Sequence, residues 1–254
     1  MSIKTHTLNG VATIEIARPE KKNAITADMY TAMADALHAA NEDDSVRSVL
    51  IHGQPGMFTS GNDLEDFMAR PPRGDDAPVF QFMRALLACE KPVVAAVTGP
   101  AIGIGTTMLL HCDLVYVADD ARLAMPFVSL GLVPEFGSSL AVPRLIGQRK
   151  AAELLMLGQP FTGEQAVEFG IANSVLPSGE VVNHARRLAE RFNGLAPSAV
   201  RETKRLMRTP DAAQMLEVIK TEAEIFGNKL RSPEAQEAFQ AFFQKRQPDF
   251  SKFS

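Results

Sequence analysis

Residues 92–107 read Pro-Val-Val-Ala-Ala-Val-Thr-Gly-Pro-Ala-Ile-Gly-Ile-Gly-Thr-Thr, an apolar run followed by a glycine-rich run. The near-continuous apolar character of residues 92–98 is typical of a strand that is buried on both faces of a sheet. The glycine-rich run then leads into a helical pattern over residues 105–112. Such a turn can bind an oxyanion, because helices begin with unpartnered N–H groups and because glycine lets a ligand approach the backbone. We therefore expect an oxyanion-binding turn around Gly103 and Gly105.

A second glycine turn is expected upstream, in the run Met-Phe-Thr-Ser-Gly-Asn-Asp-Leu at residues 57–64. It follows a predicted strand over residues 46–52 and precedes a short acidic helix that begins near Asp63. Two backbone N–H groups that converge on one carbonyl oxygen would stabilise an enolate. Tight packing of a helix on a strand explains each turn alone equally well. The spacing is neither the Gly-x-Gly-x-x-Gly of dinucleotide-binding turns nor a Walker-type phosphate loop.

The remaining pattern predicts an α/β fold in which strands alternate with helices. Further strands are expected over residues 11–17 and 114–118, and helices over residues 25–40, after a Thr26 cap, and 79–89. From residue 147 onward the chain reads as helical, with helices expected over residues 147–157, 163–169, 180–192, 198–207, 212–226 and 233–245. We therefore divide the chain into a strand-rich core over residues 1–195 and a helical C-terminal region over residues 196–254.

Composition describes an ordinary globular protein and argues against several classes. The 254 residues include 26 Lys and Arg against 30 Asp and Glu, with no long basic block, so no nucleic-acid partner is expected. The two cysteines, Cys89 and Cys112, fit neither a disulfide framework nor a Cys-x-x-Cys pair, which favours a reducing, cytoplasmic location. No apolar run is long enough for a membrane span or a signal core, so no membrane partner is expected.

Histidine spacing gives no indication of a metal site. The five histidines are scattered, and no pair has metal-ligand spacing. His-Cys-Asp at residues 111–113 is metal-like in composition, but adjacent residues point in different directions, so we interpret the three as part of the core. No metal is expected.

Glu135 is the only carboxylate between Asp120 and Glu153, and its neighbours in Gly-Leu-Val-Pro-Glu-Phe-Gly, residues 131–137, are apolar or glycine. An acid in such surroundings can be a general base whose pKa is raised by desolvation. It can equally be an acid that interacts favourably with the N-terminus of a following helix. Both interpretations stay open on the residues alone.

Taken in order, several segments resemble the enoyl-CoA hydratase/isomerase (crotonase) superfamily. The resemblance rests on residues 18–24, 58–64, 91–105, 112–113, 130–134, 144–147 and 166–170, and so covers nearly the whole chain. It implies a crotonase-like spiral of ββα repeats with a helical C-terminal trimerisation region. It also implies an acyl-CoA substrate, no separate cofactor, and assembly as a homotrimer or a dimer of trimers.

The resemblance places the two oxyanion donors on the backbone N–H groups of Asn62 and Ile104. Hydratases of this superfamily hold water with two glutamates, and this chain has Thr107 and Phe127 at the matching positions. Their absence argues against hydration, which needs a positioned water with acid/base partners. The chain is most similar to peroxisomal-type Δ3,Δ2-enoyl-CoA isomerases of fatty-acid β-oxidation. In that branch the catalytic base is a glutamate at the position of Glu135.

The resemblance also implies a set of substrate contacts. These are Lys22, Ala24, Ser60, Gly61, Asp63, Leu64, Gly103, Leu130, Pro134, Phe242 and Lys245. Phe242 and Lys245 match a C-terminal Phe-x-x-Lys that reaches the CoA of a neighbouring subunit, although the lysines serve solubility equally well. The loop over residues 67–79 is expected to shape the acyl end of the site.

Three alternatives remain open. The first is an enoyl-CoA hydratase, despite the missing glutamates. The second is a ring isomerase of aromatic acyl-CoA breakdown, which carries an aspartate at the place of Glu135. The third is a non-catalytic acyl-CoA binder, which would be expected to have lost the base or the oxyanion glycines.

Overall fold

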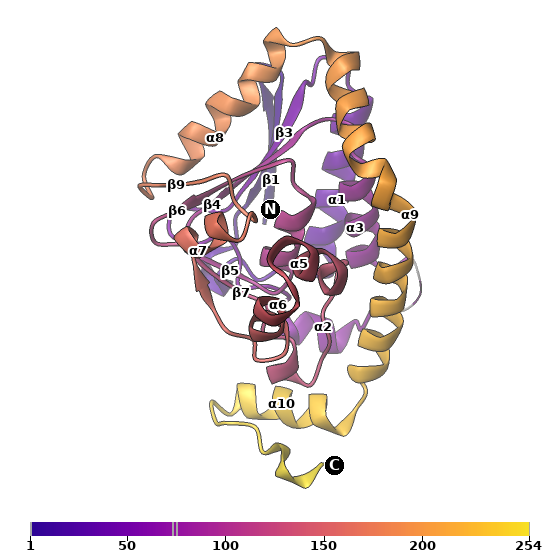
Figure 1. Ribbon diagram of the computed structural model, residues 1–254. Coiled ribbons are helices and arrows are strands. Elements are labelled where there is room, and N and C mark those ends of the chain that lie inside the picture. Colours follow the sequence, from indigo (N-terminus) through magenta and orange to yellow (C-terminus); the bar gives the residue numbers. More distant parts are fainter. Residues whose placement is uncertain (1, 73, 75, 254) are drawn as a thin grey trace.

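A six-stranded, mostly parallel sheet forms the centre of the protein in the computed structural model, which describes residues 2–72, 74 and 76–253 (Figure 1). Its strand order is β1-β2-β3-β4-β6-β9. The bounds are β1 Ile3–Leu8, β2 Val11–Ile16, β3 Ser48–His52, β4 Val93–Val97, β6 Leu114–Ala118 and β9 Ser174–Leu176. Only β1 and β2 pair antiparallel. Every residue of β4 is buried, which confirms the strand predicted from the apolar run.

A second, three-stranded sheet carries the segment that follows β4. It has the order β5-β7-β8, with bounds β5 Pro100–Ile102, β7 Arg122–Ala124 and β8 Phe161–Thr162. The strands β1, β5, β7, β8 and β9 were not predicted. The last four have only two or three residues, and β1 is exposed at five of its six positions, so neither kind has a strong apolar pattern.

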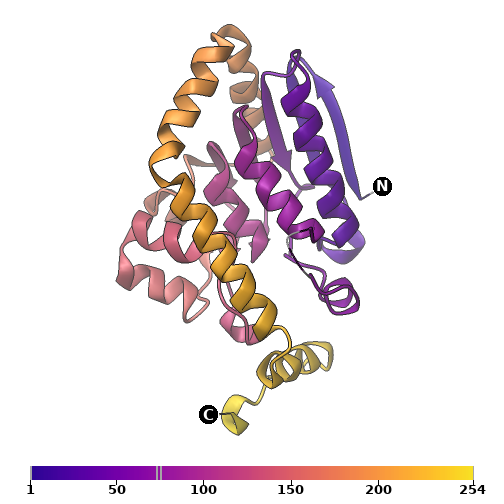
Figure 2. The ribbon, with the colours of Figure 1, turned by 90° about the vertical axis from the view of Figure 1, so that its right-hand side faces the viewer.

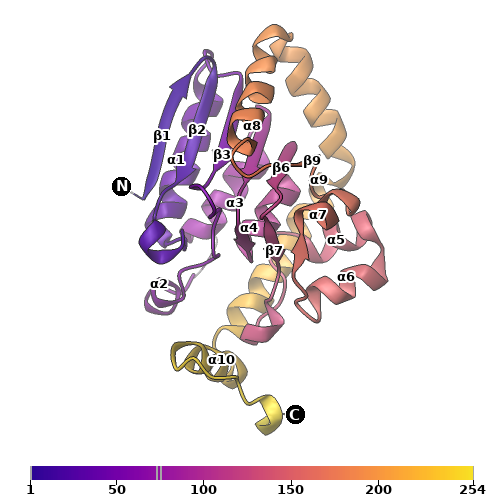
Figure 3. The ribbon, with the colours of Figure 1, turned by 90° about the vertical axis from the view of Figure 1, so that its left-hand side faces the viewer.

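Helices cover both faces of the large sheet. Figure 3 shows α8, Val181–Glu190, in front of this sheet and α1, Ala27–Glu42, behind it. Thr26 caps α1 by accepting a hydrogen bond from Met29 N–H, as predicted. Helix α3, Pro78–Ala88, packs on α1. The helix predicted over residues 105–112 is instead a short α4, Ile104–Thr107, followed by the 3₁₀ turn η2, Met108–His111.

The remaining helices before the C-terminal region are short. They are η1 Pro19–Lys21, α2 Leu64–Ala69, η3 Val128–Leu130, α5 Ser138–Ile146, α6 Gln148–Leu155, α7 Gly163–Glu168 and η4 Arg191–Gly194. Asp63 caps α2, which confirms the predicted start of that helix. Among the described residues, no helix is both long and apolar enough to cross a membrane.

The C-terminal region differs from the prediction in one respect. The separate helices expected over residues 198–207 and 212–226 form one continuous helix, α9, Pro197–Lys229, which runs along one side of the molecule (Figure 2). Pro210 lies inside it and is exposed, so the carbonyl that loses its intrahelical partner can be solvated. Contacts on both sides of Pro210 hold the helix to the core, at Lys204 and at Phe226.

Helix α10, Pro233–Phe243, and the turn η5, Phe250–Lys252, end the chain. Helix α9 packs on the core through the buried side chains of Lys204, Glu222 and Phe226. The division of the chain into a core over residues 1–195 and a C-terminal region over residues 196–254 stays a prediction.

Candidate active site

The two predicted glycine turns lie side by side. Thr59 and Ala101 form a parallel bridge, in which Thr59 N–H donates to Pro100 O at 3.0 Å and Ile102 N–H donates to Thr59 O at 3.0 Å. A Cβ atom at Gly61, whose φ is +93°, would lie only 2.9 Å from Ile102 O. Glycine is therefore required where the two segments pass each other.

This contact leaves two backbone donors available for a ligand. Ile25 N–H donates to Gly61 O at 2.8 Å and Asp63 N–H donates to Ile25 O at 2.9 Å, so the intervening Asn62 N–H faces away from that bridge. Ile104 is the first residue of α4 and follows Gly103, whose φ is +57°. Within residues 2–72, 74 and 76–253, neither Asn62 N–H nor Ile104 N–H has a hydrogen-bond acceptor. The pair has the features of an oxyanion site built from backbone groups.

The side chain of Asn62 is held by a buried phenol. Tyr30 O–H, from α1, donates a hydrogen bond to Asn62 Oδ1. Burial raises the pKa of Tyr30 well above its usual value, and the nearby charge of Glu135 raises it further. Tyr30 therefore stays a neutral donor, and it lies close enough to Glu135 to sense its charge.

Glu135 is buried, with 6% of its surface exposed. Its Oε1 atom has no hydrogen-bond partner in the described part of the chain. Burial raises the pKa of Glu135 to about 8, and the charge of Glu222 adds to that effect. A carboxyl group with this pKa can both accept and return a proton near neutral pH.

The cavity beside Glu135 is small and apolar. Its volume is about 10 Å³, which is close to the space that a single water molecule needs. Glu135 is the only acid among the described residues that line it. The others are Phe67, Pro72, Val79, Phe80, Met83, Phe136, Ile219, Ala223 and Phe226. Phe67, Pro72 and Val79 belong to the segment 67–79, which was expected to be a loop that shapes the acyl end. Phe67 lies instead in α2 and Val79 in α3, and residues 73 and 75 lie outside the described residues.

The turn that carries Glu135 is strained and firmly held. Phe136 has a φ of +56°, a left-handed conformation that is unusual for a bulky residue. Ser138 Oγ donates to Glu135 O at 2.6 Å, and His111 Nε2–H donates to Phe136 O at 2.6 Å. Glu222, from α9, accepts from Gly137 N–H at 2.6 Å. Each of the three consecutive residues 135–137 is thus bonded by a separate side chain.

The positions that matched the hydratase glutamates lie near the same site without a carboxylate. Thr107 is fully buried, and its Oγ1 atom has no partner among the described residues. Phe127 is buried, and its ring lies 6.5 Å from the ring of Phe226, centroid to centroid. Its Cε1 atom is 3.8 Å from the place of a Cβ at Gly103. An aromatic ring therefore stands at the position where the family resemblance would place a carboxylate in a hydratase.

The structure brings some of the predicted substrate contacts together. Ser60 N–H donates to Lys22 O at 3.1 Å, so Lys22 and its neighbour Ala24 lie beside Ser60 and Gly61. Leu64 begins α2 directly after this turn, and Gly103 precedes the donor Ile104.

Asp63 has structural contacts of its own within the fold. Its carboxylate pairs with Arg18 at 2.6 Å and caps α2, and its N–H and carbonyl groups are bonded to Ile25 and Phe67. Burial works against its ionised form, but the hydrogen bonds from Arg18 and Asp66 N–H outweigh burial and lower the pKa of Asp63. Asp63 has no free donor, and its substrate contact stays a prediction.

Of the remaining predicted contacts, Pro134 adjoins Glu135, whereas Phe242 and Lys245 lie outside its cavity. Pro134 directly precedes Glu135, and Leu130 ends η3, against which α10 packs. Phe242 is 58% exposed, and Lys245 is exposed just beyond α10. Neither Phe242 nor Lys245 lines the cavity that holds Glu135 in the same chain.

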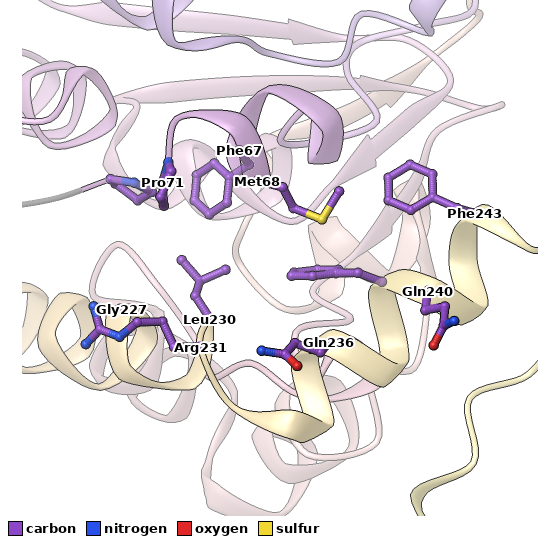
Figure 4. Close-up of a pocket in the computed structure, with 11 residues that line it drawn as sticks. Phe67, Met68, Pro71, Gly227, Leu230, Arg231, Gln236, Gln240 and Phe243 are labelled. Atoms are coloured by element: carbon purple, nitrogen blue, oxygen red, sulfur yellow. The ribbon is translucent and has the colours of Figure 1, made fainter.

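A larger pocket of about 440 Å³ lies between α2 and the C-terminal helices (Figure 4). Phe67 and Met68 face Leu230, Gln236 and Phe243 across it. Phe67 and Pro72 also line the Glu135 cavity, so the two spaces are separated by these side chains.

Sequence reasoning missed Tyr30, Phe136 and Glu222. Tyr30 follows Met29, a member of the predicted apolar stripe of its helix, so the sequence indicated only weakly that Tyr30 is buried. Glu222 lies in a polar, charge-rich helix and reads as a solvated acid. The side chains at 111–113 contact different partners: His111 bonds Phe136 O, Cys112 bonds Met108 O, and Asp113 pairs with Lys204 and Arg208.

Comparison with known proteins supports the class suggested by the fold and the site. The solved structure of Pseudomonas aeruginosa OdaA superposes with a TM-score of 0.93 and 56% sequence identity, covering 95% of this chain and 98% of that one. A probable enoyl-CoA hydratase of Bacillus subtilis (strain 168) is 30% identical, over 94% of this chain and 95% of its own length. Human enoyl-CoA delta isomerase 2 is 32% identical, over 94% of this chain and 62% of its own length.

The fold and the paired glycine turns are those of a crotonase-type protein, which confirms the predicted fold class. The sequence pattern described as enoyl-CoA hydratase/isomerase matches residues 6–252. This chain therefore belongs to the enoyl-CoA hydratase/isomerase family, and binding of an acyl-CoA substrate follows from that membership. Its relatives include hydratases as well as isomerases, so the family alone does not choose between the two reactions.

Proposed function

We propose that this enzyme is an enoyl-CoA isomerase that moves a double bond from C3 to C2 of the acyl chain. One observation carries the proposal: Glu135 lies in an apolar cavity as its only carboxylate, with one oxygen unpartnered among the described residues. Thr107 and Phe127 provide no second carboxylate. Shifting a double bond needs one base and no water, whereas hydration needs a water that is held and activated.

In the proposed mechanism, the thioester oxygen accepts hydrogen bonds from Asn62 N–H and Ile104 N–H. Glu135 removes a proton from C2 of a 3-enoyl-CoA, and the electron pair moves onto the thioester oxygen as a dienolate. The two backbone donors stabilise that charge. Protonated Glu135 then returns the proton at C4, which completes the shift and regenerates the base. The elevated pKa of Glu135 suits both steps.

The test of the proposal is Glu135→Gln, assayed with 3-hexenoyl-CoA. If Glu135 is the general base, we expect isomerisation to fall by about 10²–10⁴-fold. Glu153→Gln is the matched control, because Glu153 is an exposed acid paired only with Lys150. Unchanged turnover of Glu135→Gln would rule out the assignment.

Parallel substrates separate the alternative reactions. Fast water addition to crotonyl-CoA would favour the hydratase, and turnover of an aromatic epoxide-CoA in place of 3-hexenoyl-CoA would favour the ring isomerase. Binding of acyl-CoA without turnover of any of these substrates would favour the non-catalytic binder.

We also propose that longer acyl chains extend into the pocket between α2 and α10. A cavity of about 10 Å³ cannot hold an acyl chain, so binding must move Phe67 or Pro72, which separate the two spaces. A bulky Leu230→Trp substitution should then reduce turnover of long-chain substrates and leave 3-hexenoyl-CoA unaffected. Equal losses with both substrates would contradict this use of the pocket.

Assembly as a homotrimer or dimer of trimers remains part of the proposal. Helix α9 exposes several large apolar side chains, which would be covered in an assembly. They are Leu206, Met207, Leu216 and Ile225. A monomeric mass in solution would contradict the proposal. Lys245 and Phe242, which lie outside the Glu135 cavity of their own chain, would in the assembly be free to reach a neighbouring site.

A further inference from the structure

We propose that Glu222, on α9, is the positioning residue of Glu135 and acts through the turn formed by residues 136–139. This inference rests on the proposed function, because it takes Glu135 to be the base. Glu222 lies 87 positions after Glu135 in the numbering and belongs to the C-terminal helix rather than to the core.

Glu222 holds this turn with both carboxylate oxygens. Its Oε2 accepts from Gly137 N–H at 2.6 Å, and its Oε1 accepts from Ser139 N–H at 2.9 Å. These N–H groups are at the beginning of α5, where no intrahelical partner exists. Glu222 is buried, with 6% of its surface exposed, so the two bonds are shielded from competing water. The carboxylate therefore fixes the start of α5 from outside that helix.

The turn requires such an external restraint. Phe136 and Gly137 both have left-handed φ values, +56° and +70°, and the Phe136 conformation costs energy. A strained conformation persists only where surrounding contacts outweigh its cost. His111 contributes one such contact at Phe136 O, with its ring stacked on the Phe136 ring at 4.1 Å. Glu222 contributes the next two contacts along the chain, at Gly137 N–H and Ser139 N–H. Loosening them would let the Glu135 carboxylate move relative to the oxyanion donors.

Glu222 also acts on Glu135 through its charge. The titratable groups that face Glu135 or its turn are Tyr30 from α1, His111 from η2 and Glu222 from α9. Burial lowers the pKa of His111 to about 4, so His111 is neutral near pH 7, as is Tyr30. Burial raises the pKa of Glu222, but hydrogen bonds from Ser139 and Gly137 oppose that rise. The negative charge of Glu222 disfavours the ionised form of Glu135 and so adds to the rise that burial causes in the pKa of Glu135.

Two variants separate position from charge. Glu222→Gln keeps the shape and removes the charge, and Glu222→Asp keeps the charge and shortens the side chain. Glu224→Gln is the control, because Glu224 is an exposed acid two residues further along α9. A ¹³C NMR titration reads the pKa of the Glu135 carboxyl directly, with the Glu135→Gln variant assigning its resonance. Steady-state kinetics with 3-hexenoyl-CoA over pH 5–9 give kcat and KM.

We expect Glu222→Gln to lower the pKa of Glu135 and to move the acid limb of the pH profile to lower pH. Glu222→Asp should keep the high pKa and lower kcat by about 10–100-fold with little change in KM, because displacement of the base by about 1 Å can cost that much. Glu224→Gln should change neither. An unchanged Glu135 pKa in Glu222→Gln, or an unchanged kcat in Glu222→Asp, would overturn the inference.

The two proposals fail in different ways. If Glu135→Gln retains full activity, Glu135 is not the base, while the NMR titration still reports whether Glu222 controls its ionisation. If Glu135→Gln is inactive and both Glu222 variants match the wild type, the base is confirmed and only the role of Glu222 is wrong. Should Glu222→Gln fail to fold, Glu222→Asp alone decides the positioning role through kcat.

Discussion

The oxyanion site and the turn of Glu135 are built in opposite ways. The proposed oxyanion site consists of the backbone N–H groups of Asn62 and Ile104, which two glycine turns present through contacts between neighbouring segments. The Glu135 turn uses a side chain whose backbone is held by His111 and Glu222, and whose pKa is raised by burial and by the charge of Glu222. Both partners are distant from Glu135 in the sequence. The first region offers main-chain groups, so the side chains of Asn62 and Ile104 do not have to reach the substrate. The second depends on buried partners, so we expect substitutions in the two regions to have different signatures.

The largest expected effect concerns the cost of burying Glu135. Its carboxyl has a folded-state pKa of about 8 and an ordinary value of 4.5, so the folded state binds the proton more tightly. The stability that this proton provides is complete below pH 4.5 and is lost as the pH rises through 8. From pH 5 to pH 9 the wild type should lose on the order of 4 kcal/mol of unfolding free energy from this group.

Glu135→Gln should remove that loss, which denaturant unfolding at several pH values can measure. Glu153→Gln, at an exposed position, should retain the wild-type slope. A Glu135→Gln protein that loses stability as steeply as the wild type would show that Glu135 is not buried in its neutral form.

The second effect concerns the oxyanion region and is read in catalysis. Gly61→Ala places a Cβ atom 2.9 Å from Ile102 O at a φ of +93°, which must shift the adjacent Asn62 N–H. Loss of one oxyanion donor typically lowers kcat by about 10²–10³-fold. Gly56→Ala is the matched control, since Gly56 also has a left-handed φ, +74°, but nothing lies within 4 Å of its Cβ position. Similar kcat values for both variants would mean that Asn62 N–H does not contribute to catalysis.

These two regions also differ in how far the sequence predicts them. Gly61, Gly103 and the strand over residues 92–98 carry local signals, because a sharp turn needs glycine and a buried strand needs an apolar run. Their structures agree with the expectation. Glu135 stood out in the sequence only as an isolated acid, and nothing local predicted its partner Glu222. The contact of Glu222 with this turn depends on the path of α9, which was predicted as two separate helices. Pro210, a residue that disfavours helix interiors, lies between those two predicted helices and inside the continuous α9.

The third prediction concerns the pH dependence of the unfolding free energy that His111 causes. It is smaller than the dependence caused by Glu135 and opposite in sign. Burial lowers the pKa of His111 to about 4 from its ordinary 6.5, so the unfolded chain binds a proton that the folded protein cannot accept. Stability from this group is complete above pH 6.5 and is lost as the pH falls through 4. Between pH 7 and pH 4 the loss should be about 2–3 kcal/mol.

His111→Gln should flatten that acid limb in unfolding experiments at several pH values, whatever its effect at pH 7. His38→Gln is the control, because His38 is exposed on α1. An acid limb in His111→Gln as steep as that of the wild type would show that another group controls it.

The smallest effect distinguishes two adjacent threonines beside the oxyanion region, both fully buried. Thr106 Oγ1 donates to Ala101 O at 2.5 Å and lies 3.2 Å from Ala124 N–H, whereas Thr107 Oγ1 has no partner among the described residues. Thr106→Val removes a hydroxyl that is hydrogen-bonded, so it should lower the unfolding free energy by about 1–3 kcal/mol, because Ala124 N–H would lose its acceptor. Thr107→Val removes a hydroxyl that bonds nothing, so its unfolding free energy should change by less than about 1 kcal/mol or rise.

Turnover by Thr107→Val should equal that of the wild type, because the proposed reaction uses no water at this position. If Thr107 instead held a catalytic water, as the glutamate at the matching position does in hydratases, Thr107→Val would lower kcat without affecting stability. A fall in crotonyl-CoA hydration with unchanged isomerisation would assign that water to a hydratase side reaction. A fall in isomerisation would mean that the Thr107 hydroxyl takes part in the reaction, and the oxyanion region would then depend on a side chain as well as on its backbone donors.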